Sequence, residues 1–252
     1  MITNKRLFQT SEYERWASSS GLEAEEATLI HRFLHKDGKT LEAGSGGGRV
    51  LLALHRLGFD DLSGFDYVPE MVARAQRKDT AGFIDFRVME AERLAYPSDH
   101  FDQVLYLGQL LCFIEEEEAR RCAVQEAYRV LKGGGVALFT FLIMEVRAGR
   151  FLYRLFLNYL KIFRAWSRNQ RSVQYQPWLR REGSPNFAAL LDRPPYVYWT
   201  SVPEALAVLR SAGFSVEHIS TSTQLRAGIL RTPEADLSPF HAADKLFVVC
   251  RK

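Results

Sequence analysis

A glycine-rich stretch near the start of the chain constrains the fold more than any other feature of the sequence. Residues 40–49 read Thr-Leu-Glu-Ala-Gly-Ser-Gly-Gly-Gly-Arg, with a β-prone segment before the glycines and a helical pattern after them. A strand that turns through glycines into a helix lets a ligand touch bare backbone at the helix N-terminus. The stretch therefore predicts a site for a nucleotide-like cofactor.

Strand and helix patterns alternate along most of the chain. Apolar runs predict strands at 40–43, 62–66, 83–89, 101–107, 136–141, 214–221 and 245–251. Apolar positions at helical spacing predict helices at 22–34, 48–57, 70–76, 115–131 and 202–212. Such alternation is typical of an open α/β sheet with parallel strands and crossover helices.

Length and composition favour a single soluble globular domain. The chain has 252 residues, of which 47% are hydrophobic and 25% charged. We expect a helical cap at 1–36, a cofactor-binding core at 37–144, an inserted substrate lid at 145–200 and the last core elements at 201–252. Three widely spaced cysteines without a CxxC pair argue against a metal site and for a reducing cytosol.

Two classes of location and partner are disfavoured. Residues 1–9 lack the apolar segment of a signal peptide, and the longest apolar run, 136–144, is too short to span a bilayer. A net charge of +3 does not indicate a nucleic-acid binder. We therefore expect a cytoplasmic protein that binds no nucleic acid.

The residues around the glycines narrow the choice of cofactor. Arg49 stands where a dinucleotide motif needs its third glycine, and the lysine of a P-loop is missing. Glu42 would repel a pyrophosphate but suits a cationic ligand such as S-adenosylmethionine. Asp66 ends the second expected strand, where a carboxylate accepts ribose hydroxyls.

Several motifs in order resemble the class I S-adenosylmethionine-dependent methyltransferases. They cover 41–49, 64–71, 90–97, 101–109 and 126–135, with Glu42 in the place of the commoner Asp and Met89-Glu90 in the place of Gly-Asp. The resemblance implies an open, mostly parallel, seven-stranded Rossmann-like sheet with helices on both faces and a helical, aromatic lid after the fifth strand. It also implies cofactor contacts from Glu42, Gly44, Ser45, Gly46, Gly48, Asp66, Tyr67, Met71, Glu90, Ala91, Gly108, Gln109 and Tyr13.

Structural alternatives stand beside some of these roles. Met71 is equally well explained by helix packing, and Tyr13 and Trp16 by packing within the helical cap. Asp102 fits a structural position at the start of the fourth strand, and Cys112 fits a buried, unreactive thiol.

The insertion carries the signals for the methyl acceptor. Between 145 and 182 nine basic residues stand against Glu145 and Glu182, and apolar residues recur near helical spacing. Three interpretations stay open: a helix with a solvated basic face, a lid whose arginines hold an anionic substrate, or a membrane-surface helix at 145–168 that suits a lipid-like substrate. The aromatic, proline-rich segment 174–198 fits the wall of an acceptor pocket or a dimer contact, so monomer and homodimer are both open.

The resulting prediction is methyl transfer to an oxygen or nitrogen, ahead of carbon, of a small molecule that is anionic, aromatic or lipid-like. Such a transfer depends on alignment and exclusion of water, and an alcohol acceptor needs a base. Glu145 and His241 are the candidate bases. A non-catalytic S-adenosylmethionine-binding protein that acts through a partner and an aminopropyltransferase are the alternatives.

Overall fold

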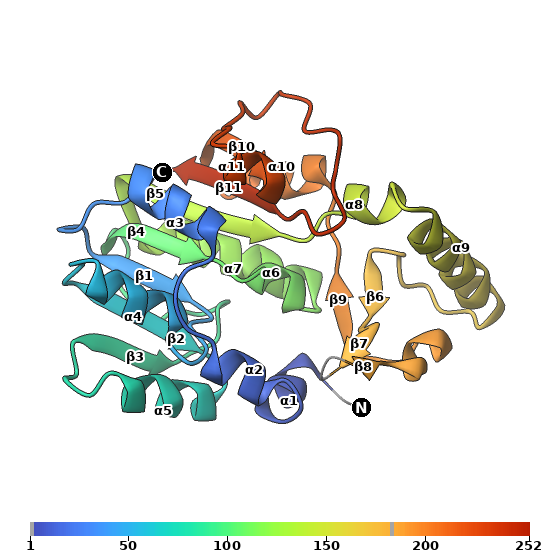
Figure 1. The fold of residues 1–252 in the computed structure, drawn as a ribbon, viewed down its shortest axis with the longest axis horizontal. Coiled ribbons are helices and arrows are strands. Elements are labelled where there is room, and N and C mark those ends of the chain that lie inside the picture. Colours follow the sequence, from blue (N-terminus) through green and yellow to red (C-terminus); the bar gives the residue numbers. More distant parts are fainter. Residues whose placement is uncertain (1–2, 182–183) are drawn as a thin grey trace.

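A seven-stranded sheet forms the centre of the molecule in the computed structural model, which describes residues 3–181 and 184–252 (Figure 1). The spatial order is β10-β11-β5-β4-β1-β2-β3, and β11 runs antiparallel to both of its neighbours while β1 to β5 pair in parallel. The strands are β1 (Thr40–Ala43), β2 (Leu62–Asp66), β3 (Ile84–Val88), β4 (Phe101–Tyr106), β5 (Leu131–Phe141), β10 (Ser215–Thr221) and β11 (Leu246–Arg251). The predicted open, mostly parallel sheet is confirmed.

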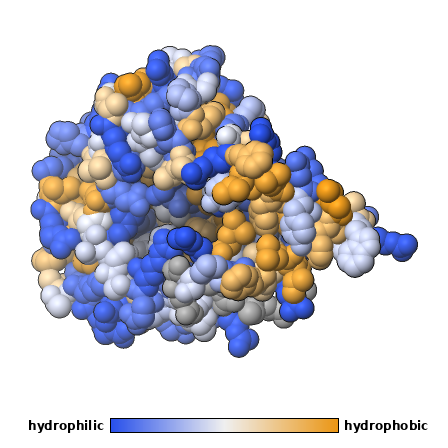
Figure 2. All heavy atoms as spheres, turned by 45° about the vertical axis from the view of Figure 1, so that its right-hand side comes forward, coloured by the Kyte–Doolittle hydropathy of each residue, from blue (hydrophilic) through white to orange (hydrophobic). Residues whose placement is uncertain are grey.

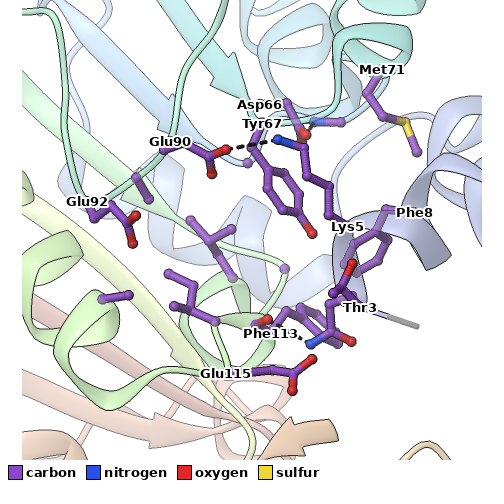
Figure 3. Close-up of a pocket in the computed structure, with 18 of the residues that line it drawn as sticks. Thr3, Lys5, Phe8, Asp66, Tyr67, Met71, Glu90, Glu92, Phe113 and Glu115 are labelled. Atoms are coloured by element: carbon purple, nitrogen blue, oxygen red, sulfur yellow. Dashed lines mark hydrogen bonds and ion pairs between the residues drawn. The ribbon is translucent and has the colours of Figure 1, made fainter. Parts of the chain in front are cut away.

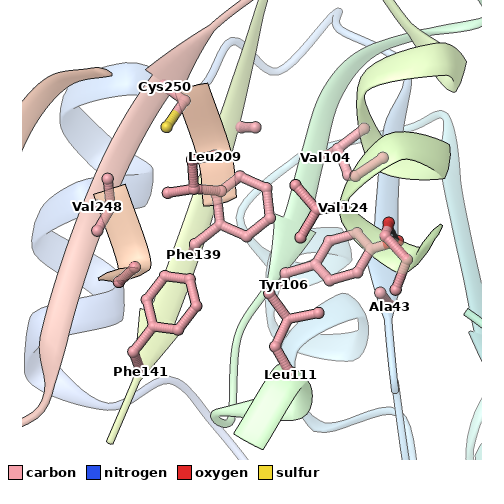
Figure 4. Close-up of a cluster of buried hydrophobic side chains, with 14 of the residues drawn as sticks. Ala43, Val104, Tyr106, Leu111, Val124, Phe139, Phe141, Leu209, Val248 and Cys250 are labelled. Atoms are coloured by element: carbon pink, nitrogen blue, oxygen red, sulfur yellow. Dashed lines mark hydrogen bonds between the residues drawn. The ribbon is translucent and has the colours of Figure 1, made fainter. Parts of the chain in front are cut away.

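Helices cover both faces of the sheet. One face packs against α3 (Ala24–Phe33), α4 (Arg49–Arg56), α5 (Pro69–Lys78) and α11 (Ser222–Arg226). The other packs against α7 (Glu117–Val130) and α10 (Val202–Ser211). Side chains alternate between the faces along each strand. In β5, Phe139 belongs to the cluster beneath α7 and α10, and Leu138 to the opposite cluster (Figure 4).

The N-terminal helices lie over the glycine loop. They are α1 (Asn4–Gln9) and α2 (Tyr13–Ser18). A Cβ on Gly47 would lie 2.4 Å from the carbonyl oxygen of Ala17, so the loop must be glycine for α2 to approach so closely. The Nζ of Lys78 joins the two segments by donating to the carbonyl oxygens of Ala17 and Gly47, at 2.5 and 3.0 Å.

The segment after β5 forms an arm at the right of Figure 1. Its long helix α9 was predicted, but its short strand pairs, β6 with β9 and β7 with β8, were not. Glu182, counted in the charge of the insertion, lies outside the described residues. The elements are α8 (Met144–Ala148), α9 (Phe151–Trp166), β6 (Tyr175–Pro177), β7 (Arg180–Arg181), β8 (Ser184–Pro185), the 3-10 helix η1 (Phe187–Leu191) and β9 (Tyr196–Tyr198), and the short helix α6 (Leu110–Phe113) follows β4.

A buried ion pair holds this arm together. The guanidinium of Arg164 on α9 donates from Nη2 and Nε to the two carboxylate oxygens of Asp192, at 2.6 and 2.8 Å. The two side chains are only 3% and 2% exposed. Breaking such a pair from one side leaves an uncompensated buried charge.

We expect Asp192→Asn to lower the free energy of unfolding by about 3 kcal/mol. Asparagine keeps the shape and tolerates the left-handed backbone at this position, so the lost charge is the main change. Urea denaturation measures the effect. The matched control, Glu217→Gln in the half-exposed pair with Arg251, should cost less than about 1 kcal/mol. Equal losses in the two variants would contradict this role for the buried pair.

Candidate cofactor and acceptor cavities

A cavity of about 480 Å³ opens where β1, β2 and β4 end. Its volume falls within the usual range for a small-molecule site. Among the residues predicted to bind the cofactor, it is lined by Gly44, Gly46, Asp66, Tyr67, Met71, Glu90, Ala91 and Gly108. We call it the first cavity. The structure thus brings together residues from four separate sequence motifs.

Two glycines leave backbone open to a ligand in the first cavity. Gly46 and Gly108 have φ of +52° and +64°, a region that other residues rarely adopt. A Cβ on either would meet only an atom of Trp16, at 3.9 Å, so the space beside the backbone is free. This is the close approach that the glycine pattern predicts.

Asp66 holds the glycine loop and presents its carboxylate to the first cavity. Its Oδ2 accepts from the N–H of Gly46 and its Oδ1 from the N–H of Val68, both at 2.9 Å. Burial raises the pKa of Asp66 to about 6 in spite of these two hydrogen bonds. The group is therefore ionised at neutral pH but takes up a proton in mild acid.

The N-terminal helix α1 closes one side of the first cavity (Figure 3). Lys5 forms an ion pair with Glu90 at 2.9 Å, and its Nζ lies 5.1 Å from the centre of the Tyr67 ring. Phe8 and Trp16 line the cavity beside them. Sequence reasoning considered Trp16 together with Tyr13 but missed Lys5 and Phe8, whose charge and aromatic ring were not distinctive without the fold.

Four predicted contacts line neither this cavity nor the next. Tyr13 donates its hydroxyl to the carbonyl oxygen of Glu70, at 3.3 Å. Gly48, in a left-handed backbone conformation, is the N-cap residue of α4. The backbone N–H of Ser45 donates to the carbonyl oxygen of Phe65. The fourth residue is Glu42.

Glu42 lies buried on β1, behind the glycine loop. Burial raises the pKa of its carboxyl well above the ordinary value, although the positive charge of Arg49 acts in the opposite direction. Its Oε2 has no hydrogen-bond partner among the described residues. An orphaned carboxylate oxygen at this position fits a nearby cationic ligand, although direct contact with the cofactor stays a prediction.

A second cavity, of about 640 Å³, adjoins the first. Trp16, Gly108 and Phe113 line both cavities, so the two meet at the end of β4. Gln109, the remaining predicted cofactor contact, lines the second. The walls of this second cavity are rich in aromatic residues, namely Trp16, Phe113, Tyr153, Trp178 and Trp199.

The two cavities differ in charge. The charged residues that line the first are mainly acidic: Asp66, Glu90, Glu92, Glu115 and Glu116, against Lys5 and Arg171. The charged residues that line the second are mainly basic: Arg15, Arg49, Arg147, Arg180 and Lys245, against Glu23. The first therefore suits a cationic ligand and the second an anionic one.

Arg147 is the most distinctive group in the second cavity. Its guanidinium carbon lies 3.9 Å from the centre of the Tyr153 ring and 4.0 Å from that of Trp199. Its Nε and Nη1 are buried and have no hydrogen-bond partner among the described residues. Burial lowers the pKa of the guanidinium to about 10, so it stays charged at neutral pH. A buried cation with unused donors calls for an anionic partner.

The two candidate bases lie apart from each other and line neither cavity. The Oε1 of Glu145 accepts from the N–H of Val202 at 2.9 Å and so caps the start of α10. This contact helps to fix α8, the helix that carries Arg147. His241 is exposed in the loop before β11. Among residues 3–181 and 184–252, no group of three or more His, Cys, Asp and Glu side chains is arranged to hold a metal ion.

Comparisons with known proteins show similarity to methyltransferases. A family model described as a methyltransferase domain matches residues 41–139. Demethylmenaquinone methyltransferase of Thermus thermophilus is 31% identical over 185 residues, covering 71% of this chain and 76% of that protein. The chloroplastic 2-methyl-6-phytyl-1,4-hydroquinone methyltransferase 1 of Oryza sativa subsp. japonica is 28% identical over 63% of this chain, which spans only 43% of that relative.

Solved structures share the fold. A S-adenosylmethionine-dependent methyltransferase from Methanosarcina mazei matches with a TM-score of 0.67 and 19% identity, over 89% of this chain and 96% of that one. Another from Mesorhizobium loti matches with a TM-score of 0.58 and 19% identity, over 91% and 98% of the two chains.

The protonation of Asp66 should make the affinity for the cofactor depend on pH. Ribose hydroxyls donate to an ionised carboxylate, so binding of S-adenosylhomocysteine favours the deprotonated form. Because the pKa of Asp66 is about 6, affinity should fall as the pH drops through 6 and level off above it. We expect Asp66→Asn to weaken binding by about 10- to 100-fold, since an amide group then faces a backbone N–H.

Isothermal titration calorimetry across this pH range measures both effects. Asp85→Asn on the neighbouring strand β3, in an exposed pair with Arg87, is the matched control and should bind like the wild type. Unchanged affinity in Asp66→Asn would contradict the assignment.

Proposed function

Because this chain belongs to the class I S-adenosylmethionine-dependent methyltransferases, we propose that it methylates a small aromatic molecule that carries an ionisable hydroxyl group. The observation that carries this proposal is the guanidinium of Arg147, which lies against two aromatic rings while its Nε and Nη1 have no hydrogen-bond partner among the described residues. The names of the relatives, which refer to a hydroquinone and to demethylmenaquinone, support the same class of acceptor.

The first cavity fits the cofactor. Asp66 is placed to accept from the ribose, and Tyr67, Met71 and Ala91 line the space for the adenine. The free backbone at Gly46 and Gly108 lets the rest of the molecule extend toward the second cavity. When bound, S-adenosylmethionine supplies a methyl group on a sulfonium that leaves as a neutral thioether.

The second cavity fits the acceptor. Its aromatic walls bury a flat ring, and Arg147 is placed to donate from Nε and Nη1 to an oxyanion on that ring. The two cavities meet at Gly108, so a ring held by Arg147 faces the methyl donor. Closing this junction with Trp16 and Phe113 excludes water from the reacting atoms.

The charge of Arg147 also replaces a general base. A free phenol has a pKa near 10, like that of tyrosine. A guanidinium about 4 Å away, at an effective dielectric constant of about 20, favours the phenolate by about 4 kcal/mol, enough to lower its pKa to about 7. The hydroxyl proton then passes to solvent before the new bond to the methyl carbon forms. This accounts for activity although neither Glu145 nor His241 lines the cavity.

The atom that receives the methyl group stays a prediction. Oxygen and nitrogen rank ahead of carbon in the sequence argument, but an ionised phenol is nucleophilic at its oxygen and at neighbouring ring carbons. An NMR spectrum of the product distinguishes a methoxy group from a ring methyl. A binding role without catalysis and aminopropyl transfer are disfavoured, since the relatives are named methyltransferases.

Arg147→Met provides the sharpest test of the acceptor site. With a 1,4-naphthohydroquinone as acceptor at pH 7, we expect kcat/KM to fall about 500-fold, because a phenol whose pKa returns from about 7 to about 10 is about 0.1% ionised instead of about half ionised. The rise of kcat with pH should move from about 7 toward 10, because the phenolate loses its counter-charge. Affinity for S-adenosylhomocysteine should not change.

Arg56→Met, which removes an exposed cation at the end of α4, is the matched control. It should leave both the rate and its pH dependence unchanged. A wild-type pH profile in Arg147→Met would show that the guanidinium does not act on the acceptor.

A further inference from the structure

We propose that the outer face of the arm is a docking surface for an anionic lipid membrane. Large apolar side chains on two elements of the arm are exposed there, and Figure 2 shows hydrophobic side chains gathered on this side of the molecule. We call this surface the apolar stripe. It consists of Phe151, Leu152, Leu155, Tyr159, Ile162 and Trp166 of α9 with Phe187, Leu190 and Leu191 of η1.

The apolar stripe is continuous and firmly supported. The hydroxyl of Tyr159 donates to the carbonyl oxygen of Leu190, which places η1 beside α9. The opposite side of α9 is buried, since it carries the buried Leu157 and Leu160 and Arg164, whose ion pair with Asp192 holds the arm together. The helix therefore already packs against its own chain through one side, and the apolar stripe is the side that remains exposed.

The exposure is large for side chains of this kind. Trp166 is 81% exposed, Leu152 77% and Ile162 72%. From Phe151 to Trp166 the helix runs about 23 Å at 1.5 Å per residue. A row of this length that remains in water is unfavourable and marks an interaction site.

The surrounding charge selects the partner. Arg150, Arg154, Lys161 and Arg168 are exposed on or beside α9. No aspartate or glutamate occurs from 146 to 181. A second copy of the chain would bring these cations against one another, whereas anionic lipid headgroups complement them. Apolar and aromatic residues on one face with flanking cations are the pattern of a helix that lies in a membrane surface.

The proposed membrane surface lies close to the second cavity. Among the described residues, no helix is long and apolar enough to cross a bilayer. Because Tyr153 of α9 lines the second cavity, the proposed surface lies next to the acceptor site. Acceptor molecules dissolved in the lipid would thus be close to the cavity, although the docking itself does not depend on the proposed reaction.

Vesicle co-sedimentation of the whole chain tests the proposal. We expect binding to vesicles of phosphatidylcholine with phosphatidylglycerol, weak binding to phosphatidylcholine alone, and loss of binding as the salt concentration rises. The double variant Leu152→Glu with Ile162→Glu should bind the anionic vesicles at least about tenfold more weakly, because two carboxylates oppose both the apolar and the ionic contribution.

Phe83→Glu is the matched control, since Phe83 is 58% exposed and directly precedes β3, the edge strand of the sheet, outside the arm. It should bind vesicles like the wild type, and calorimetry with S-adenosylhomocysteine verifies that every variant is folded. Absence of vesicle binding, or equal binding by the double variant, would overturn the proposal. So would a dimer in sedimentation that the double variant dissociates, which would assign the stripe to a second copy. None of these outcomes depends on methyl transfer, so the two proposals fail separately.

Discussion

The separation of charge between two adjoining cavities is the constraint on which the rest of the site depends. Acidic residues, Asp66 and Glu90 among them, line the space for a cationic cofactor, and basic residues line the space beyond it. In the reaction that we propose, a sulfonium cofactor and an oxyanion acceptor attract each other across the junction at Gly108. The proposed arrangement brings the opposite charges together beside aromatic side chains, where electrostatic interactions are stronger than in water.

The N-terminal helices are part of this site even though they lie far from it in sequence. Lys5 pairs with Glu90, and Trp16 lines both cavities. The side-chain amide of Asn4 donates to the carbonyl oxygens of Phe113 and Tyr196, both at 2.8 Å. The same residue therefore connects α1 to the helix after β4 and to the arm. A change in the position of α1 would therefore alter the shape of both cavities.

Much of the fold could be predicted from the sequence because its signals are local. The continuous apolar run of β5 and the glycine turn before α4 depend on neighbours within a few residues. The strand pairs of the arm could not be predicted, since Tyr175 and Tyr198 pair across 23 positions in a segment without regular patterning.

Some residues of the candidate site could likewise be predicted from the sequence, and others could not. Asp66 and the glycines follow from spacing along two strands. Arg147 does not, because the sequence shows nine basic residues between 145 and 182 and gives no sign of which one lies against two rings with Nε and Nη1 unpaired among the described residues. Glu145 had the right type for a base, but the structure uses its Oε1 to cap α10.

The most direct test of the two-cavity arrangement is a structure of the protein with S-adenosylhomocysteine and a hydroquinone bound together. The arrangement predicts the sulfur beside Gly108 and Trp16, with a ring oxygen within hydrogen-bond distance of the Arg147 guanidinium. A ring bound in the outer part of the first cavity, near Glu115 and Arg171, would contradict it.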